Sequence, residues 1–125
     1  MPKTMSTVMI VDDSHFIRLR LTKLLSQHGY QVVEAKDGEE AVQAYRRQPA
    51  DAVLMDMAMP RKHGSAALRE MRAFDPQARV IMLTGVNQQA VVLRAMQAGA
   101  EDFLVKPFDD EQVLKALQKA LAKVA

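Results

Sequence analysis

The chain has 125 residues, of which 49% are hydrophobic and 26% charged, and its formal net charge is +2. This length and composition are typical of one globular domain with a single core. The small net charge, the lack of a basic run and an aromatic content of 5% argue against nucleic acid as a partner. No apolar stretch reaches the roughly 18 residues that span a bilayer, and there is no cysteine for a disulfide or a thiolate metal site. We therefore expect a cytoplasmic protein without a membrane or nucleic-acid partner, and a flexible N-terminus over residues 1–6 before one domain over 7–125.

Short apolar runs alternate with segments of helical period along the chain. Strands are predicted over residues 8–11, 30–35, 52–55, 80–83 and 102–105. A helix is predicted after each strand: up to Gly29, from Asp37 to Pro49, from His63 to Phe74, from Asn87 to Ala98, and from Asp109 onward. Five strands alternating with five helices over short loops predict an α/β fold, namely a doubly wound, five-stranded parallel sheet with helices on both faces. The alternating pattern of residues 30–35 places that strand at an edge.

Four of the apolar runs end in residues that can take part in chemistry. Asp12 and Asp13 follow the first run, Asp56 the third, Thr84 the fourth and Lys106 the fifth. Because the carboxyl ends of parallel strands meet at one edge of the sheet, we expect these side chains to converge on one shallow cleft. An aspartate in such a position is often only a helix N-cap, but Ser14 can cap the first helix, which leaves the doubled acid without a structural explanation.

This set of side chains favours phosphoryl chemistry at Asp56. Crowded carboxylates repel unless a cation neutralises them, and an all-oxygen ligand set suits Mg²⁺, with Mn²⁺ as the alternative ion. The Asp56 carboxylate can attack phosphorus, while Lys106 and the Thr84 hydroxyl stabilise the phosphoryl oxygens. The backbone N–H groups of Met57 and Gly85 are candidate further donors to the phosphate.

With these residues in place, the chain resembles the receiver domain of bacterial two-component response regulators, and in size the stand-alone chemotaxis-type regulators. The resemblance covers essentially the whole chain and implies a flavodoxin-like strand order of 2-1-3-4-5. It also implies roles for individual residues: an acidic metal-binding pair at Asp12 and Asp13, a phosphoacceptor at Asp56 within a motif that includes Met59, Pro60 and Gly64, a switch hydroxyl at Thr84, a switch aromatic at Phe103, and a lysine at Lys106 that precedes a proline across a cis peptide.

The resemblance implies a signalling switch and not an enzyme with a separate substrate. A histidine kinase or a histidine phosphotransfer protein would donate a phosphoryl group to Asp56 in a Mg²⁺-dependent reaction, and slow self-dephosphorylation would end the signal. Phosphorylation would alter a partner-binding surface within Asn87–Val124, and the downstream target is not identified by the sequence. Whether the protein stays monomeric or dimerises on phosphorylation is left open.

Two positions depart from the pattern of the family. Ala58 stands where a polar residue is often found, so that its carbonyl can still bind Mg²⁺ but its side chain cannot influence an attacking water. Phe103 stands where many relatives have tyrosine, so that no phenolic hydrogen bond is available. The first departure bears on the lifetime of the phosphoryl group, and the second on the output.

The sequence leaves two alternative functions to compare with a signalling switch. A Mg²⁺-dependent phosphohydrolase with an aspartyl nucleophile would carry a second aspartate where this chain has Ala58. A flavin-binding module of flavodoxin type would need a first loop that accepts phosphate, which Asp12 and Asp13 would repel.

The remaining features are given simpler interpretations. His15, His28 and His63 lack the spacing of metal ligands, and we interpret them as surface or packing residues. In the helix from Asn87 to Ala98, a buried face of Val92, Ala95, Met96 and Gly99 would leave Val91 and Leu93 partly exposed as a target-docking edge. Phe16 and Leu19 on the first helix are the candidate docking site for the phosphodonor.

Overall fold

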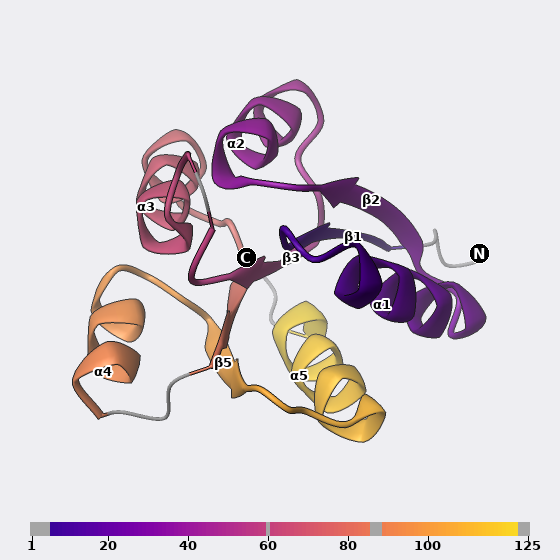
Figure 1. The fold of residues 1–125 in the computed structure, drawn as a ribbon. Helices are drawn as coiled ribbons and strands as arrows, with labels where there is room; N and C mark the ends of the chain where they lie inside the picture. The colour runs from indigo at the N-terminus through magenta and orange to yellow at the C-terminus, as the bar shows by residue number, and fades with distance from the viewer. Residues whose placement is uncertain (1–5, 60, 86–88, 123–125) are drawn as a thin grey trace.

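The computed structural model describes residues 6–59, 61–85 and 89–122. Five parallel strands form one sheet in the order β2-β1-β3-β4-β5, which confirms the predicted architecture and strand order (Figure 1). The strands are β1 (Thr7–Val11), β2 (Gln31–Ala35), β3 (Ala52–Asp56), β4 (Val80–Thr84) and β5 (Asp102–Val105). The helices are α1 (His15–Gln27), α2 (Gly38–Arg47), α3 (Gly64–Phe74), α4 (Gln89–Gln97) and α5 (Asp110–Ala122).

The sheet separates two hydrophobic cores. Successive residues of a strand point to opposite faces, so Val53 and Met55 of β3 pack on one side of the sheet while Ala52 and Leu54 pack on the other. Helices α2, α3 and α4 cover the first face, and α1 and α5 cover the second (Figure 1). All five residues of β3 are buried. The central strand therefore holds Asp56 rigidly at its carboxyl end.

The local signals in the sequence act largely as predicted. Strand β2 is at an edge of the sheet and is mostly exposed. Asp37 caps α2, accepting a hydrogen bond from the N–H of Glu40 at 2.8 Å. Asp109 and Gln112 cap α5 reciprocally, with N–H to side-chain oxygen distances of 2.8 and 2.9 Å. These caps satisfy N–H groups that have no partner within the helix.

Helix α4 differs from the prediction in which face it buries. Ala95 is its buried residue, and Val91 and Val92 are half-buried. Met96, predicted to be buried, is 41% exposed, and Leu93 is 54% exposed. The described helix has only 9 residues, and a stripe centred on Ala95 leaves the next residue, about 100° further round, outside the contact. The predicted start at Asn87 and the motif residue Pro60 lie outside the described residues, as do residues 1–5 and 123–125.

No helix in the described ranges combines the length and apolar character needed for a membrane span.

Candidate functional site

The carboxyl ends of β1 and β3 bring three aspartates together. Asp12 is 1% exposed and Asp56 4% exposed, whereas Asp13 is exposed. Carboxylate oxygens of all three lie within 4.8 Å of one another. The N-cap of α1 is Ser14, whose Oγ accepts a hydrogen bond from the N–H of Ile17 at 3.3 Å. Capping therefore does not account for Asp13, and the predicted convergence of the acidic residues is present.

Lys106 joins this acidic group from the end of β5. Its Nζ lies 3.0 Å from Oδ1 of Asp56 and 3.2 Å from Oδ2 of Asp12. The Lys106–Pro107 peptide is cis, as the family resemblance implied. The backbone N–H of Lys106 also donates to the carbonyl oxygen of Thr84 at 2.7 Å, which ties the lysine to the neighbouring strand. One ammonium group thus partly neutralises two buried carboxylates.

The surroundings of Asp56 disfavour the negatively charged form of its carboxyl group. Burial raises the pKa of the Asp56 carboxyl group above its ordinary value, and the charges of Asp12 and Asp13 act in the same direction, while Lys106 opposes them. Burial alone would lower the pKa of Lys106, but the hydrogen bond and charge of Asp56 outweigh it, and the pKa is raised. One lysine against three carboxylates leaves negative charge that a divalent cation would neutralise.

Thr84 and Phe103 lie on the same face of the sheet. Met82 is opposite Phe103 in the β4–β5 register, and Thr84 is two residues beyond Met82. Thr84 is 4% exposed, and Phe103 is partly buried against the core under α2, α3 and α4. Because residues two apart on a strand share a face, the two side chains are on the face that α4 covers. This is the arrangement that a coupled movement of the pair requires.

The two predicted backbone donors are differently placed. The N–H of Met57 donates to the carbonyl oxygen of Leu83 at 2.9 Å, extending the β3–β4 ladder. Binding of phosphate to this N–H would require that hydrogen bond to be shared or broken. Gly85 lines the pocket beside Asp56, and a Cβ added there would meet no atom of the described residues within 4 Å. The space next to Gly85 is therefore open.

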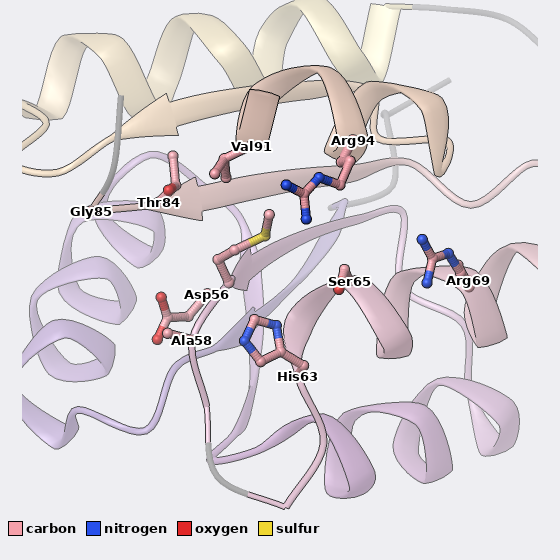
Figure 2. Close-up of a pocket in the computed structure, with 10 residues that line it drawn as sticks. Asp56, Ala58, His63, Ser65, Arg69, Thr84, Gly85, Val91 and Arg94 are labelled. Atoms are coloured by element: carbon pink, nitrogen blue, oxygen red, sulfur yellow. The ribbon is translucent and has the colours of Figure 1, made fainter. Parts of the chain in front are cut away.

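A pocket of about 550 Å³ opens beside Asp56 (Figure 2), and Asp12 and Asp13 do not line it. Asp56, Ala58, Thr84 and Gly85 form the end of the pocket at the strand edge, and α3 and α4 form its walls. Its polar lining from the two helices and the residue before α3 consists of His63, Ser65, Arg69 and Arg94. Asp56 consequently has an acidic neighbourhood on one side and a partly cationic pocket on the other.

His63 is exposed, in agreement with its interpretation as a surface residue, but it also lines the pocket beside Asp56, which the sequence does not predict. Figure 2 shows its ring extending from the start of α3 toward Asp56 and Ala58. The only sequence signal was its position directly before Gly64. The other two histidines do not line this pocket.

Comparison with known proteins identifies the family. Residues 8–118 match the response regulator receiver domain. The chain is 44% identical over 115 residues to the chemotaxis protein CheY of Bacillus subtilis, covering 91% of this chain and 96% of that protein. Among solved structures, it is similar to the CheY of a CheX–CheY–BeF3–Mg²⁺ complex from Borrelia burgdorferi, with a TM-score of 0.90, 36% identity and coverage of 94% of this chain and 90% of that chain. Chemotaxis protein CheY4 of Vibrio cholerae gives a TM-score of 0.90 at 32% identity, covering 94% of this chain and 100% of that chain.

These matches distinguish among the functions considered from the sequence. They extend over nearly the whole chain, and they agree with the strand order and with the cluster of Asp12, Asp13, Asp56 and Lys106. The chain belongs to the response regulator receiver domain family, and it is CheY-like.

Proposed function

We propose that this protein is a cytoplasmic phosphorylation switch that accepts a phosphoryl group on Asp56 from a histidine kinase or a histidine phosphotransfer protein. The observation that carries the proposal is the convergence on Asp56 of two further aspartates and Lys106. The Asp56 carboxylate would attack phosphorus, and the bond from phosphorus to the donor nitrogen would break. Lys106 and Thr84 would stabilise the negative charge on the transferred group.

The donor set of the site fits Mg²⁺. Asp12, Asp13 and Asp56 offer only oxygen ligands close together, with the carbonyl of Ala58 as the further candidate, and Mn²⁺ accepts the same ligands. When bound, the ion would neutralise charge on the phosphoryl oxygens. Asp12 and Asp13 would hold the ion, while the buried position of Asp56 keeps its carboxylate fixed for attack.

The output would be a change in the surface made by α4, β5 and α5. Phosphate on Asp56 would draw the Thr84 hydroxyl toward it, and Phe103, on the same face of the sheet, would move into the space released. This surface falls within the predicted Asn87–Val124 region, of which residues 89–122 are described. Leu93 and Met96 of α4 are its exposed apolar residues. The protein would act by binding a downstream target and not by turning over a substrate.

The test is stoichiometric incorporation of phosphate from a small-molecule donor. Purified protein is incubated with acetyl phosphate in the presence of Mg²⁺, of Mn²⁺, or of a chelator, and its intact mass is measured. We expect one phosphoryl group per chain with either ion, little with the chelator, and none in Asp56→Asn. Asp51→Asn is the matched control, since Asp51 immediately precedes the other end of β3. Incorporation into Asp56→Asn would contradict the proposal.

The same protein samples can be used to test the phosphohydrolase alternative, the oligomeric state and the identity of the kinase. Rapid release of phosphate over many turnovers would indicate a phosphohydrolase in place of a switch. Size-exclusion chromatography before and after phosphorylation would decide between a monomer and a phosphorylation-dependent dimer. The histidine kinase of the same cell that transfers phosphate fastest would be the cognate donor.

A further inference from the structure

Asp56 has two unlike sides, and on the second side the pocket continues beyond Ala58, Thr84 and Gly85 to residues that have no part in the phosphorylation chemistry described above. Asp12, Asp13 and Lys106 surround one side. The other side opens into the 550 Å³ pocket, where the ring of His63 extends toward Asp56 (Figure 2). A molecule of water reaching the phosphorylated carboxylate from this side would meet the imidazole.

Close packing on the C-terminal side of His63 fixes its position. The backbone of Gly64 lies against the end of β3, so that a Cβ at this position would be 2.1 Å from the carbonyl oxygen of Asp56 and 2.9 Å from Cα of Met57. The N–H of Gly64 donates to the carbonyl oxygen of Met57 at 2.9 Å. The residue that follows His63 is therefore in direct contact with the backbone of Asp56.

Packing on the N-terminal side of His63 also fixes the position of its backbone. Lys62 lies against the first residue of α2, since a Cβ at Gly38 would be 2.5 Å from the carbonyl oxygen of Lys62. The ammonium group of Lys62 forms ion pairs with Glu39 and Glu70. The backbone of His63 is thus held between one residue anchored to α2 and another anchored to β3, which fixes where its side chain begins.

The side chain of His63 has no structural task in the described part of the chain. It is at the N-cap position of α3 but makes no capping hydrogen bond, and its ring has no hydrogen bond or ion pair with residues 6–59, 61–85 or 89–122. The neighbouring Ala58 contributes only a methyl group to the pocket. In Figure 2, Arg69 lies at the end of the pocket away from Asp56, and Arg94 projects from α4. Among the polar side chains that α3, α4 and the residue before α3 contribute to the pocket, the imidazole is the one that extends toward Asp56, where it can orient a water.

We infer that His63 positions the water that hydrolyses the aspartyl phosphate, and this inference rests on the proposed function. A ring nitrogen accepts a hydrogen bond from the water and directs its oxygen toward phosphorus. The new bond forms between the water oxygen and phosphorus, while the bond from phosphorus to the Asp56 oxygen breaks and its electron pair returns to the carboxylate. Both protons of the water leave with the phosphate as dihydrogen phosphate. His63 would thereby set the lifetime of the phosphorylated state.

The experiment measures the decay of the phosphorylated protein. Wild type, His63→Ala, His63→Gln and the matched control His28→Ala are phosphorylated with acetyl phosphate and Mg²⁺, the donor is removed, and the phosphorylated fraction is followed by intact mass. We expect His63→Ala to decay at least about tenfold more slowly, with its rate of phosphorylation unchanged. His63→Gln, which keeps a hydrogen-bonding group, should recover part of the rate, and His28→Ala should decay like wild type.

The outcomes separate the inference from the proposed function. Absence of phosphate incorporation in wild type would overturn both. Incorporation followed by equal decay of wild type and His63→Ala would overturn the inference alone, as would a Gln variant as slow as the Ala variant. Equal slowing of phosphorylation and decay in His63→Ala would indicate a merely structural role. His63→Leu, which fills a similar space without hydrogen-bonding atoms, answers the same question if His63→Ala does not fold.

Discussion

The ammonium group of Lys106 lies 3.0 Å from Oδ1 of Asp56, although the two residues are 50 positions apart in the chain. The contact exists because β3 and β5, which flank β4, end at the same edge of the sheet. The same ammonium group reaches Asp12 at 3.2 Å. Since both carboxylates are buried, the pair behaves as a charge-assisted contact that is weakly screened by solvent.

Replacing Lys106 by methionine should affect phosphorylation, metal binding and stability in different directions. We expect the rate of phosphorylation by acetyl phosphate to fall about a hundredfold, because a donor to the phosphoryl oxygens is lost. The affinity for Mg²⁺ should rise, because a competing cation is removed from the carboxylates. The free energy of unfolding without metal should fall by about 2 kcal/mol, because Asp12 and Asp56 lose their partner.

Calorimetric titration with Mg²⁺ and urea unfolding measure the last two effects. Lys115→Met is the control, since Lys115 forms an exposed ion pair with Glu111 on α5. A lower Mg²⁺ affinity in Lys106→Met would contradict the assignment of the lysine as a competitor of the metal.

Asp56→Asn should stabilise the metal-free protein at neutral pH by about 1 kcal/mol while abolishing phosphorylation. The folded state raises the pKa of Asp56 above the value of 3.8 that applies when it is unperturbed. A raised carboxyl pKa means that the folded protein binds this proton more tightly than the unfolded chain, so the charged form costs stability above the folded pKa. This cost is relieved as the pH falls through the folded pKa.

The advantage of Asp56→Asn over wild type should therefore be largest at neutral pH and should shrink as the pH falls toward 3.8. Urea unfolding at a series of pH values in the presence of a chelator measures this difference. If the stability difference between Asp56→Asn and wild type instead grew as the pH falls, the charged form of Asp56 would not be disfavoured in the folded protein.

Gly64→Ala should destabilise the protein by about 2 kcal/mol. The added methyl would lie 2.1 Å from the carbonyl oxygen of Asp56, which is backbone and can move only with β3. Thermal unfolding measures the loss. Gly85→Ala is the matched control, because its methyl would meet no atom within 4 Å in the described part of the chain, and its melting temperature should stay close to that of wild type. Equal stability of the two variants would contradict the tight contact at Gly64.

The two exposed apolar surfaces should have separable roles. Phe16 and Leu19 on α1 are 71% and 58% exposed, and Leu93 on α4 is 54% exposed. We expect Phe16→Glu to slow phosphotransfer from the kinase about tenfold and Leu93→Glu to weaken binding of the target about tenfold, with phosphorylation by acetyl phosphate unchanged in both. Leu93 is preferred to Val91, which is half-buried and lines the pocket.

The effect of Phe16→Glu is measured as the rate of phosphotransfer from the kinase, and the effect of Leu93→Glu as the affinity for the target by calorimetry. Each variant serves as the control for the other. The same loss of target binding in Phe16→Glu and Leu93→Glu would contradict the division of the two surfaces.

The sequence predicted the acidic side of the site because each functional residue there ends an apolar run. Asp12, Asp56, Thr84 and Lys106 are at or directly after the carboxyl ends of strands, and the parallel arrangement of the strands is enough to bring them together. The pocket side was not predictable in this way. His63 is placed by contacts of its neighbours with α2 and β3, and such contacts depend on backbone distances that no residue pattern encodes.

Helix α4 illustrates the same limit for packing. The helical period correctly indicated a helix near residues 89–97 and a buried Ala95. The rotation of the helix about its axis was wrong for Met96, since a short helix rich in apolar residues offers more than one plausible buried stripe. By contrast, the caps at Asp37 and Asp109 were predictable because a cap depends only on residues three apart in sequence.

If His63 sets the lifetime of the phosphorylated state, the contact between Gly38 and Lys62 gives α2 a part in that timing. Helix α2 does not line the pocket, yet its first residue supports the loop that carries His63 toward Asp56. A change at Gly38 should therefore alter the duration of a signal without altering any residue that touches phosphate, metal or target. Related regulators could acquire fast or slow responses through the spacing of two backbones, while their chemical machinery stays the same.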